Sequence, residues 1–237
     1  RAVDYAYQAR LRFPDRRLFL VGEIIHNPHV NSRLREAGIT FLYPGPDGAF
    51  DFNDIRPEDV VIIPAFGVTV TDFSRLQTIG CAIVDTTCGS VLNVWKRVEQ
   101  YARDGFTALI HGKYRHEETK ATASQVFKHP GGHYLIVLDM AEARLVTNYI
   151  ERTADALDRE QFLAHFAEKS SPGFDPDVHL VRIGCANQTT MLAGESLAIA
   201  AEIGRALERR YGSEPDFDLS RHFRSFDTIC SATQERQ

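Results

Sequence analysis

Two cysteines, Cys88 and Cys230, have the residue type and the positions that most directly suggest chemistry. Each stands among small and hydroxylated residues, in segments 85–88 and 228–237, where a helix is expected to begin. The helix dipole favours a thiolate at such a place. Two thiolates far apart in the sequence are typical of a metal cluster held between domains. The competing interpretation is that each cysteine is a small buried hydrophobic residue.

The other two cysteines, Cys81 and Cys185, lie beside apolar runs of strand length and are expected to be buried. The four cysteines of the chain include no C-x-x-C pair, which a structural zinc site usually needs. They are also too scattered for a small disulfide scaffold. We therefore expect a reducing compartment, the cytoplasm.

Two histidines follow predicted strands at positions where a small anion could bind. His26 precedes Asn27 and Pro28, which are typical of an N-cap and a first helical position. His116 lies in segment 111–119, where lysine and arginine side chains stand next to helix-terminal amides that suit phosphate. The alternatives are a surface-loop histidine and an ordinary charged helix start.

Carboxylate and hydroxyl groups stand near the same strand ends. Glu118 brings a possible proton donor to the segment that carries His116. In segment 186–191, where the longest helix is predicted to begin, Thr189 and Thr190 place two hydroxyls at a further strand end. Capping of that helix is the alternative role for one of these threonines. Four strand-to-helix transitions therefore carry polar groups that could converge.

The elements that must position these residues alternate between strand and helix. Helical spacing of apolar residues is clearest from Val91 to Tyr101 and, in the longest candidate, from Leu192 to Leu207. The alternation predicts βαβ units with mostly parallel sheets and right-handed crossovers, an α/β fold. The predicted strands are residues 18–21, 60–64, 82–84, 108–111, 134–138 and 179–183.

Domain boundaries are expected after Cys88 and near Arg224. They divide the chain into a first α/β domain (1–88), a second (89–224) and the start of a third (225–237). Both candidate cluster ligands would then lie at domain edges, a common place for a site.

Composition excludes several classes of protein. The 237 residues are 43% hydrophobic and 25% charged, as in an ordinary globular protein. The net charge of −5 argues against nucleic acid as the main partner, because phosphate binding requires a basic surface. No apolar run approaches the roughly 18 residues needed to span a bilayer, so no membrane partner is predicted.

Taken together, these segments resemble the 4-hydroxy-3-methylbut-2-enyl diphosphate reductases, LytB-type iron–sulfur enzymes of the non-mevalonate isoprenoid pathway. The matching segments run through nearly the whole chain: 23–27, 84–88, 112–124, 188–190 and 228–237. Segments 110–119 and 187–192 are similar to the longer plant and cyanobacterial branch. Gly89 and Ser90 stand where plant members have Pro-Trp, which favours a bacterial source; a plant source would imply the plastid.

The resemblance implies a three-lobed α/β fold around a central 4Fe-4S cluster held by three cysteines. It makes Cys88 and Cys230 two of these ligands. The segment with the remaining ligand and a C-terminal diphosphate-binding part have no counterpart here. We therefore expect a chain truncated at both ends, with the third lobe largely missing and the fragment alone inactive.

The resemblance also implies roles for four further residues. His26 and His116 would bind the diphosphate, Glu118 would relay a proton, and Thr189 would be its hydroxyl neighbour near the substrate. Phe66 stands where many members have a phosphate-binding histidine, and we interpret this as a trait of the branch.

The implied reaction is the reductive dehydroxylation of an allylic diphosphate to isopentenyl and dimethylallyl diphosphates. A ferredoxin or a flavodoxin-type protein would supply the electrons. The alternative function is that of a non-redox α/β phosphate-binding or hydrolytic protein with incidental cysteines.

Overall fold

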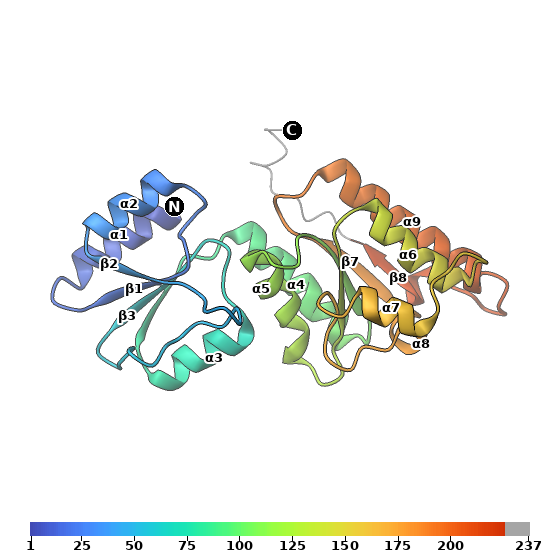
Figure 1. Cartoon of the computed structure of the whole chain (residues 1–237), viewed down its shortest axis with the longest axis horizontal. Helices are drawn as coiled ribbons and strands as arrows, with labels where there is room; N and C mark the ends of the chain where they lie inside the picture. The colour runs from blue at the N-terminus through green and yellow to red at the C-terminus, as the bar shows by residue number, and fades with distance from the viewer. Residues whose placement is uncertain (226–237) are drawn as a thin grey trace. The chain divides into compact units, whose positions relative to one another are not determined.

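A computed structural model describes residues 1–225 of the chain (Figure 1). Cys230 and the rest of segment 228–237 lie outside the described residues. The chain forms two compact units, Arg1–Leu92 and Asn93–Gln237, which are described separately. The predicted domain ranges stay a prediction.

Unit 1 is built on a four-stranded parallel sheet in the order β2-β1-β3-β4. The connection after each of the first three strands contains a helix or a long loop, as the predicted βαβ units require. The strands are β1 (Leu18–Val21), β2 (Ile39–Leu42), β3 (Val60–Ile63) and β4 (Ala82–Asp85). The helices are α1 (Ala2–Arg12), α2 (Pro28–Glu36) and α3 (Val70–Ile79), and the boundary to unit 2 falls within α4 (Gly89–Arg103).

Helices cover both faces of this sheet, because β1 and β3 are apolar at every position. Side chains of a strand alternate between faces. Leu20 and Ile62 pack in a cluster with residues of α1 and α2. Val21 and Ile63 pack on the opposite face in a cluster that includes Leu76 of α3.

Unit 2 repeats this arrangement with a parallel sheet in the order β6-β5-β7-β8. Its strands are β5 (Thr107–His111), β6 (Tyr134–Val137), β7 (Ile183–Asn187) and β8 (Phe223–Ser225). Its helices, after α4, are α5 (Glu117–Ser124), η1 (Gln125–Lys128), α6 (Met140–Glu151), α7 (Arg159–His165), α8 (Pro176–His179), α9 (Ala193–Tyr211) and η2 (Leu219–Arg221). Leu109, Leu135 and Ile183 pack against α6, α7 and α9, while Ala108 and Ile110 face α4.

The parallel α/β fold is therefore confirmed, but one predicted strand is wrong. Residues 179–183 are apolar enough for a strand, yet the Asp175 side chain accepts a hydrogen bond from the Asp177 backbone N–H and caps the helical turn of α8. The strand begins only at Ile183. The edge strands β2 and β8 were not predicted, because they are short and only partly buried.

One glycine of β7 shows why this strand was hard to recognise. A Cβ atom on Gly184 would lie 2.4 Å from Cγ of Tyr101, so only glycine leaves room for that ring. The Tyr101 hydroxyl then donates a hydrogen bond to the Cys185 carbonyl oxygen at 3.1 Å. Position 184, which packs closely on α4, is therefore a glycine and not one of the β-branched residues that are typical of strands.

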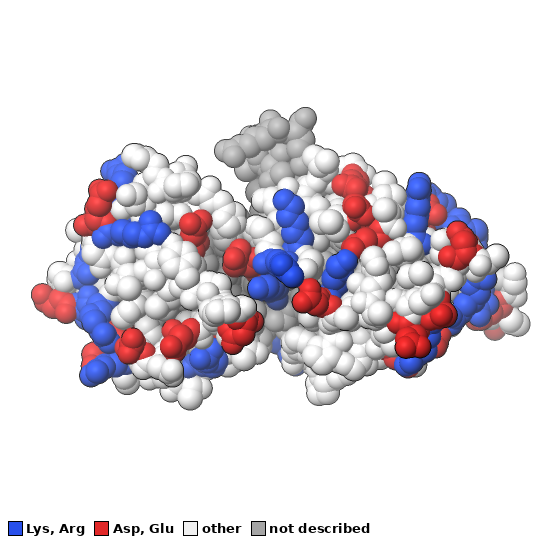
Figure 2. All heavy atoms as spheres, in the orientation of Figure 1, with Lys and Arg blue, Asp and Glu red and all other residues white. Residues whose placement is uncertain are grey.

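Both sheets have a topological switch point, between β1 and β3 and between β5 and β7. Open α/β sheets bind ligands at the carboxyl ends of the strands beside such a point. Within residues 1–225, no helix is both long and apolar enough to cross a membrane. Basic and acidic side chains are interspersed on the face shown in Figure 2.

Candidate functional site

In unit 1, three connections lie side by side beyond the carboxyl ends of β1, β3 and β4. The Ala65 backbone N–H donates to the Ile24 carbonyl oxygen at 3.3 Å, and the Cys88 N–H donates to the Ala65 carbonyl oxygen at 3.0 Å. The segments that carry His26, Phe66 and Cys88 are therefore neighbours. The first two follow β1 and β3 at the switch point, and the third follows the adjacent strand, β4.

His26 lies on the loop between β1 and α2, and its side chain is half-exposed. Asn27 caps α2 as predicted, because its side chain accepts hydrogen bonds from two backbone N–H groups of the first turn. The imidazole stacks on the Phe66 ring, with centroids 4.4 Å apart, and its Nδ1 lies 3.4 Å from Oε2 of Glu23. Phe66 thus orients this histidine, although it cannot itself bind phosphate.

Cys88 is exposed and directly precedes α4, so its predicted place at a helix start is confirmed. Its carbonyl oxygen accepts the first helical hydrogen bond, from Leu92. Asp85 accepts hydrogen bonds from the backbone N–H and the hydroxyl of Thr87 and thereby shapes the turn before it. An accessible thiol where the helix dipole favours negative charge fits the chemistry of an iron–sulfur ligand.

Cys81 and Cys185 differ from Cys88, since both are buried as predicted. Burial raises the pKa of the Cys81 thiol and raises that of Cys185 to about 12. Neither side chain is suited to ligate a metal, because the ligand must be a thiolate.

In unit 2, His116 is the N-cap of α5. Its Nδ1 accepts a hydrogen bond from the Glu118 backbone N–H at 3.1 Å. An accepting Nδ1 carries no proton, so the ring proton of this histidine is on Nε2. His116 therefore presents a donor at a helix N-terminus, which suits an anion.

Glu118 and Thr189, from α5 and from the turn after β7, are in contact. The Glu118 carboxylate is 1% exposed, and its Oε1 accepts the Thr189 backbone N–H at 2.5 Å. The two predicted catalytic residues thus meet at the β5/β7 switch point. The contact uses the Thr189 backbone, and the role of its hydroxyl stays a prediction.

Capping of α9 by Thr189 or Thr190 is wrong. The helix begins at Ala193, and its N-cap is Leu192, whose side chain makes no capping hydrogen bond. Thr190 is engaged elsewhere, since its hydroxyl accepts a hydrogen bond from Nε2 of Gln188 at 2.7 Å.

Gln188 is a structural residue of the site that the sequence interpretation passed over. It is 2% exposed, and its Oε1 accepts from the Lys113 backbone N–H at 3.1 Å and from the Thr119 hydroxyl at 3.0 Å. Its position is the signal that could have identified it. The side-chain amide of a glutamine that directly follows a strand can bind the loop after a neighbouring strand. A Cβ on Gly112 would lie 2.9 Å from the Thr119 hydroxyl oxygen, so this loop requires glycine.

Behind this loop, His111 joins the ends of two strands to α9. Its Nδ1 lies 2.8 Å from the Ser196 hydroxyl oxygen, and its Nε2 lies 3.1 Å from the Leu138 carbonyl oxygen. Burial lowers the pKa of His111, so the ring is neutral near pH 7.

A model of the LytB protein family matches residues 1–237, which is the whole chain. The chain belongs to the LytB protein family. The resemblance seen in the sequence is therefore confirmed. This LytB chain is 52% identical over 237 residues to a 4-hydroxy-3-methylbut-2-enyl diphosphate reductase from Thermosynechococcus vestitus and 50% identical to one from a Cyanothece species. Each alignment covers 100% of this chain and 56% of the relative, so the LytB chain spans about half the length of these relatives.

Solved structures agree on the fold. A structure described as (E)-4-hydroxy-3-methyl-but-2-enyl diphosphate reductase, the terminal enzyme of the non-mevalonate pathway, matches with a TM-score of 0.67 and 22% identity over 100% of the LytB chain and 65% of its own. A reductase from Plasmodium falciparum matches with a TM-score of 0.66 and 16% identity over 99% of the LytB chain and 57% of its own.

Proposed function

We propose that this LytB protein reduces (E)-4-hydroxy-3-methylbut-2-enyl diphosphate to isopentenyl and dimethylallyl diphosphates. The observation that carries the proposal is the buried Glu118 carboxylate, which is held by the Thr189 backbone N–H next to His116. The allylic hydroxyl is a poor leaving group until it is protonated, so the reaction needs an acid at a fixed position. The names of the similar reductases support this assignment.

In this proposal the residues of the chain bind, orient and protonate the substrate. His116 and His26 bind the diphosphate, and the N-terminus of α5 adds backbone N–H groups. The Nε2–H of His116 is the donor, because its Nδ1 is occupied by the Glu118 N–H. Glu118 delivers the proton with which the substrate oxygen leaves as water, and Thr189 fixes the position of the carboxylate.

A 4Fe-4S cluster is part of the proposal, with Cys88 and Cys230 among its ligands. When bound, such a cluster supplies electrons and an open iron position. Only Cys88 lies among the described residues, and its exposed thiol before α4 fits this role. We propose a ferredoxin or a flavodoxin-type protein as the electron donor and the cytoplasm as the location.

The alternative is a non-redox protein that binds or hydrolyses phosphate esters with the same histidines. The experiment incubates the anaerobically purified full-length protein with the substrate and reduced methyl viologen, and follows the C5 diphosphates by mass spectrometry and phosphate by a colorimetric assay. We expect isopentenyl and dimethylallyl diphosphates without phosphate release. Phosphate release without reduced products would establish the alternative.

A further inference from the structure

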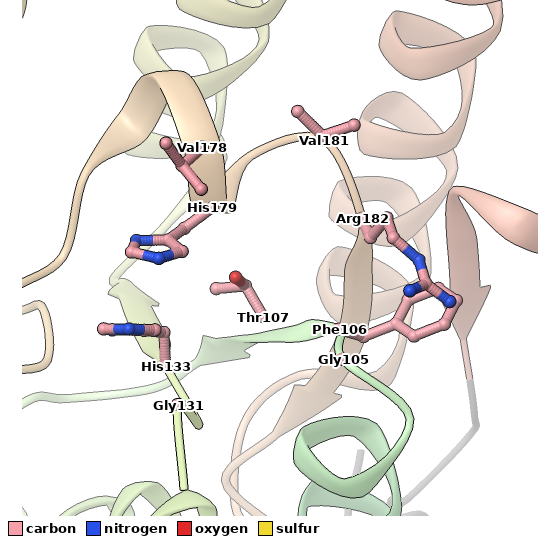
Figure 3. A pocket seen from close by; sticks show the side chains of 9 residues that line it. All are labelled: Gly105, Phe106, Thr107, Gly131, His133, Val178, His179, Val181 and Arg182. Carbon is pink, nitrogen blue, oxygen red and sulfur yellow. The ribbon is translucent and has the colours of Figure 1, made fainter.

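A cavity opens in unit 2 at the amino ends of β5 and β7, the edge of the sheet opposite the site described above (Figure 3). Its volume is about 370 Å³. Its lining includes the side chains of Thr107, His133 and His179, which come from three segments far apart in the sequence. The proposed reaction uses none of these residues.

The two histidines are held by contacts at the same ring atom, Nδ1. Their rings stack with centroids 3.7 Å apart. Nδ1 of His179 accepts the Asp175 backbone N–H at 2.8 Å, and Nδ1 of His133 lies 2.8 Å from the Ser171 hydroxyl oxygen. That oxygen also accepts the Tyr134 N–H at 3.3 Å. Because its Nδ1 accepts a hydrogen bond, the neutral ring of His179 carries its proton on Nε2, and His133 does the same when the Ser171 hydroxyl donates to its Nδ1.

The Nε2 atoms have no hydrogen-bond partner among residues 1–225. Burial lowers the pKa of both rings, and for His179 the neighbouring His133 lowers it further, so both are neutral near pH 7. Two lining residues of the cavity therefore have an Nε2 atom that no described group satisfies.

Thr107 adds a third polar side chain to the cavity. The residue is 5% exposed, and its backbone N–H donates to the Arg182 carbonyl oxygen at 2.8 Å. Its hydroxyl has no hydrogen-bond partner in the part of the chain that the structure describes. Figure 3 shows this hydroxyl facing the same space as the His179 ring. The hydroxyl oxygen is accessible from the cavity and can therefore bond to a ligand there.

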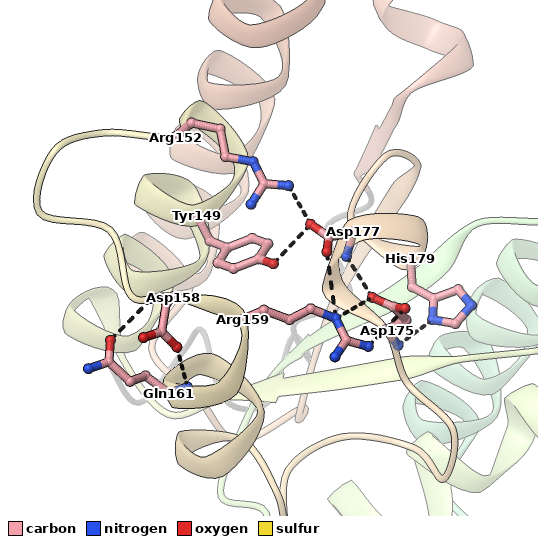
Figure 4. Close-up of polar contacts among 8 residues, drawn as sticks. All are labelled: Tyr149, Arg152, Asp158, Arg159, Gln161, Asp175, Asp177 and His179. Atoms are coloured by element: carbon pink, nitrogen blue, oxygen red, sulfur yellow. Dashed lines mark hydrogen bonds and ion pairs between the residues drawn. The ribbon is translucent and has the colours of Figure 1, made fainter.

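Hydrogen bonds hold the segment that carries His179. The Tyr149 hydroxyl donates to Oδ1 of Asp177 at 2.9 Å, and Nη2 of Arg159 donates to Oδ2 of Asp175 at 3.0 Å (Figure 4). The Asp175 carboxylate is thus committed to Arg159. The nine residues that line the cavity include no carboxylate, so the lining offers donors and no negative charge.

We propose that this cavity binds a small organic oxyanion, a carboxylate or a phosphate monoester. Its oxygens accept hydrogen bonds from Nε2 of His133, Nε2 of His179 and the Thr107 hydroxyl. Its apolar part contacts Val178 and Val181, which also line the cavity. A few convergent polar groups in a mostly apolar cavity are typical of small-molecule sites.

The test uses the full-length protein with benzoate and phenyl phosphate as probes, and with benzamide as the uncharged control. The readout is the Hε1 resonance of each histidine in ¹H–¹³C spectra, assigned by single substitutions. One of the two anions should shift the His133 and His179 resonances saturably, and the anion that does so identifies the oxyanion. Benzamide should bind about tenfold or more weakly, because charged acceptors make the stronger hydrogen bonds.

The Thr107→Val variant keeps the side-chain shape and removes the hydroxyl, so affinity should fall about tenfold. Thr107→Ser keeps the hydroxyl and should bind almost as tightly as the wild type. Absence of saturable shifts with both anions, equal binding of benzamide, or unchanged affinity in Thr107→Val would each overturn the proposal. The comparison with benzamide needs no variant, so it decides the question even if Thr107→Val is unstable.

Discussion

Replacing Glu118 by glutamine removes the acidic proton from the site and keeps the shape of the side chain. The Glu118 carboxylate is 1% exposed, and its Oε1 accepts the Thr189 backbone N–H at 2.5 Å. The glutamine amide has almost the same size, and its oxygen can accept the same hydrogen bond. The substitution therefore removes the transferable proton but leaves the packing.

We expect this substitution to cause a small loss of stability and a large loss of turnover. The Thr189 hydrogen bond is kept, and a neutral hydrogen bond contributes about 0.5–1.5 kcal/mol, so the free energy of unfolding should fall by no more than about 1 kcal/mol. In a protein of this size that lowers the melting temperature by only about 2–4 °C. Loss of a general acid should lower turnover about 100-fold or more, which is about 2.7 kcal/mol of activation free energy.

The assay is turnover with reduced methyl viologen in cluster-loaded full-length protein, together with a thermal melt. Glu117→Gln is the matched control, because Glu117 is the preceding residue of the same helix but is exposed. We expect the control to be nearly as active as the wild type. Wild-type turnover in Glu118→Gln at full cluster content would refute the role of Glu118 as the proton donor.

Three further predictions concern other parts of the chain. Gly184→Ala would place a Cβ atom 2.4 Å from Cγ of Tyr101, so the free energy of unfolding in urea should fall by about 1–3 kcal/mol; an unchanged midpoint would be inconsistent with this packing. Burial acts to raise the pKa of Asp59, but two hydrogen bonds from Arg17 keep it below its ordinary value. A pKa that is lower in the folded state gives stability that is complete above about pH 5 and is lost as the pH falls through the folded pKa. Asp59→Asn should therefore flatten the acid side of the stability–pH profile, and an unaltered slope would contradict this linkage. His116→Ala should raise the Kd for the substrate about tenfold, while His116→Asn, which can still cap α5, should show the same weakening with a smaller loss of stability; equal affinity in all three proteins would exclude diphosphate binding by this side chain.

Much of the fold could be predicted from local signals. The apolar runs of β1 and β3 and the Asn27 cap with Pro28 are properties of neighbouring residues, and the structure contains them as predicted. The places of Cys88 before a helix and of Glu118 at the start of a helix followed from the same alternation.

The remaining features depend on contacts between distant segments. β7 was misplaced because its Gly184 is explained only by the Tyr101 ring, which comes from another helix. The contact of Glu118 with Thr189 is made by a backbone N–H. Every non-proline residue has this group, so no sequence motif can predict the contact. The cavity at Thr107 is lined by segments that are far apart in the sequence, so no local sequence pattern predicts it.

The central claim is that this protein is an iron–sulfur reductase in which Cys88 is a cluster ligand. The most direct measurement determines iron, sulfide and the formation of C5 diphosphates in the same anaerobic preparations of the full-length wild type, Cys88→Ser and Cys81→Ser. Cys81 is the matched control, since its thiol is buried whereas that of Cys88 is exposed. We predict that Cys81→Ser keeps both iron and turnover and that Cys88→Ser loses both together. Full iron loading and normal product formation in Cys88→Ser would contradict the account.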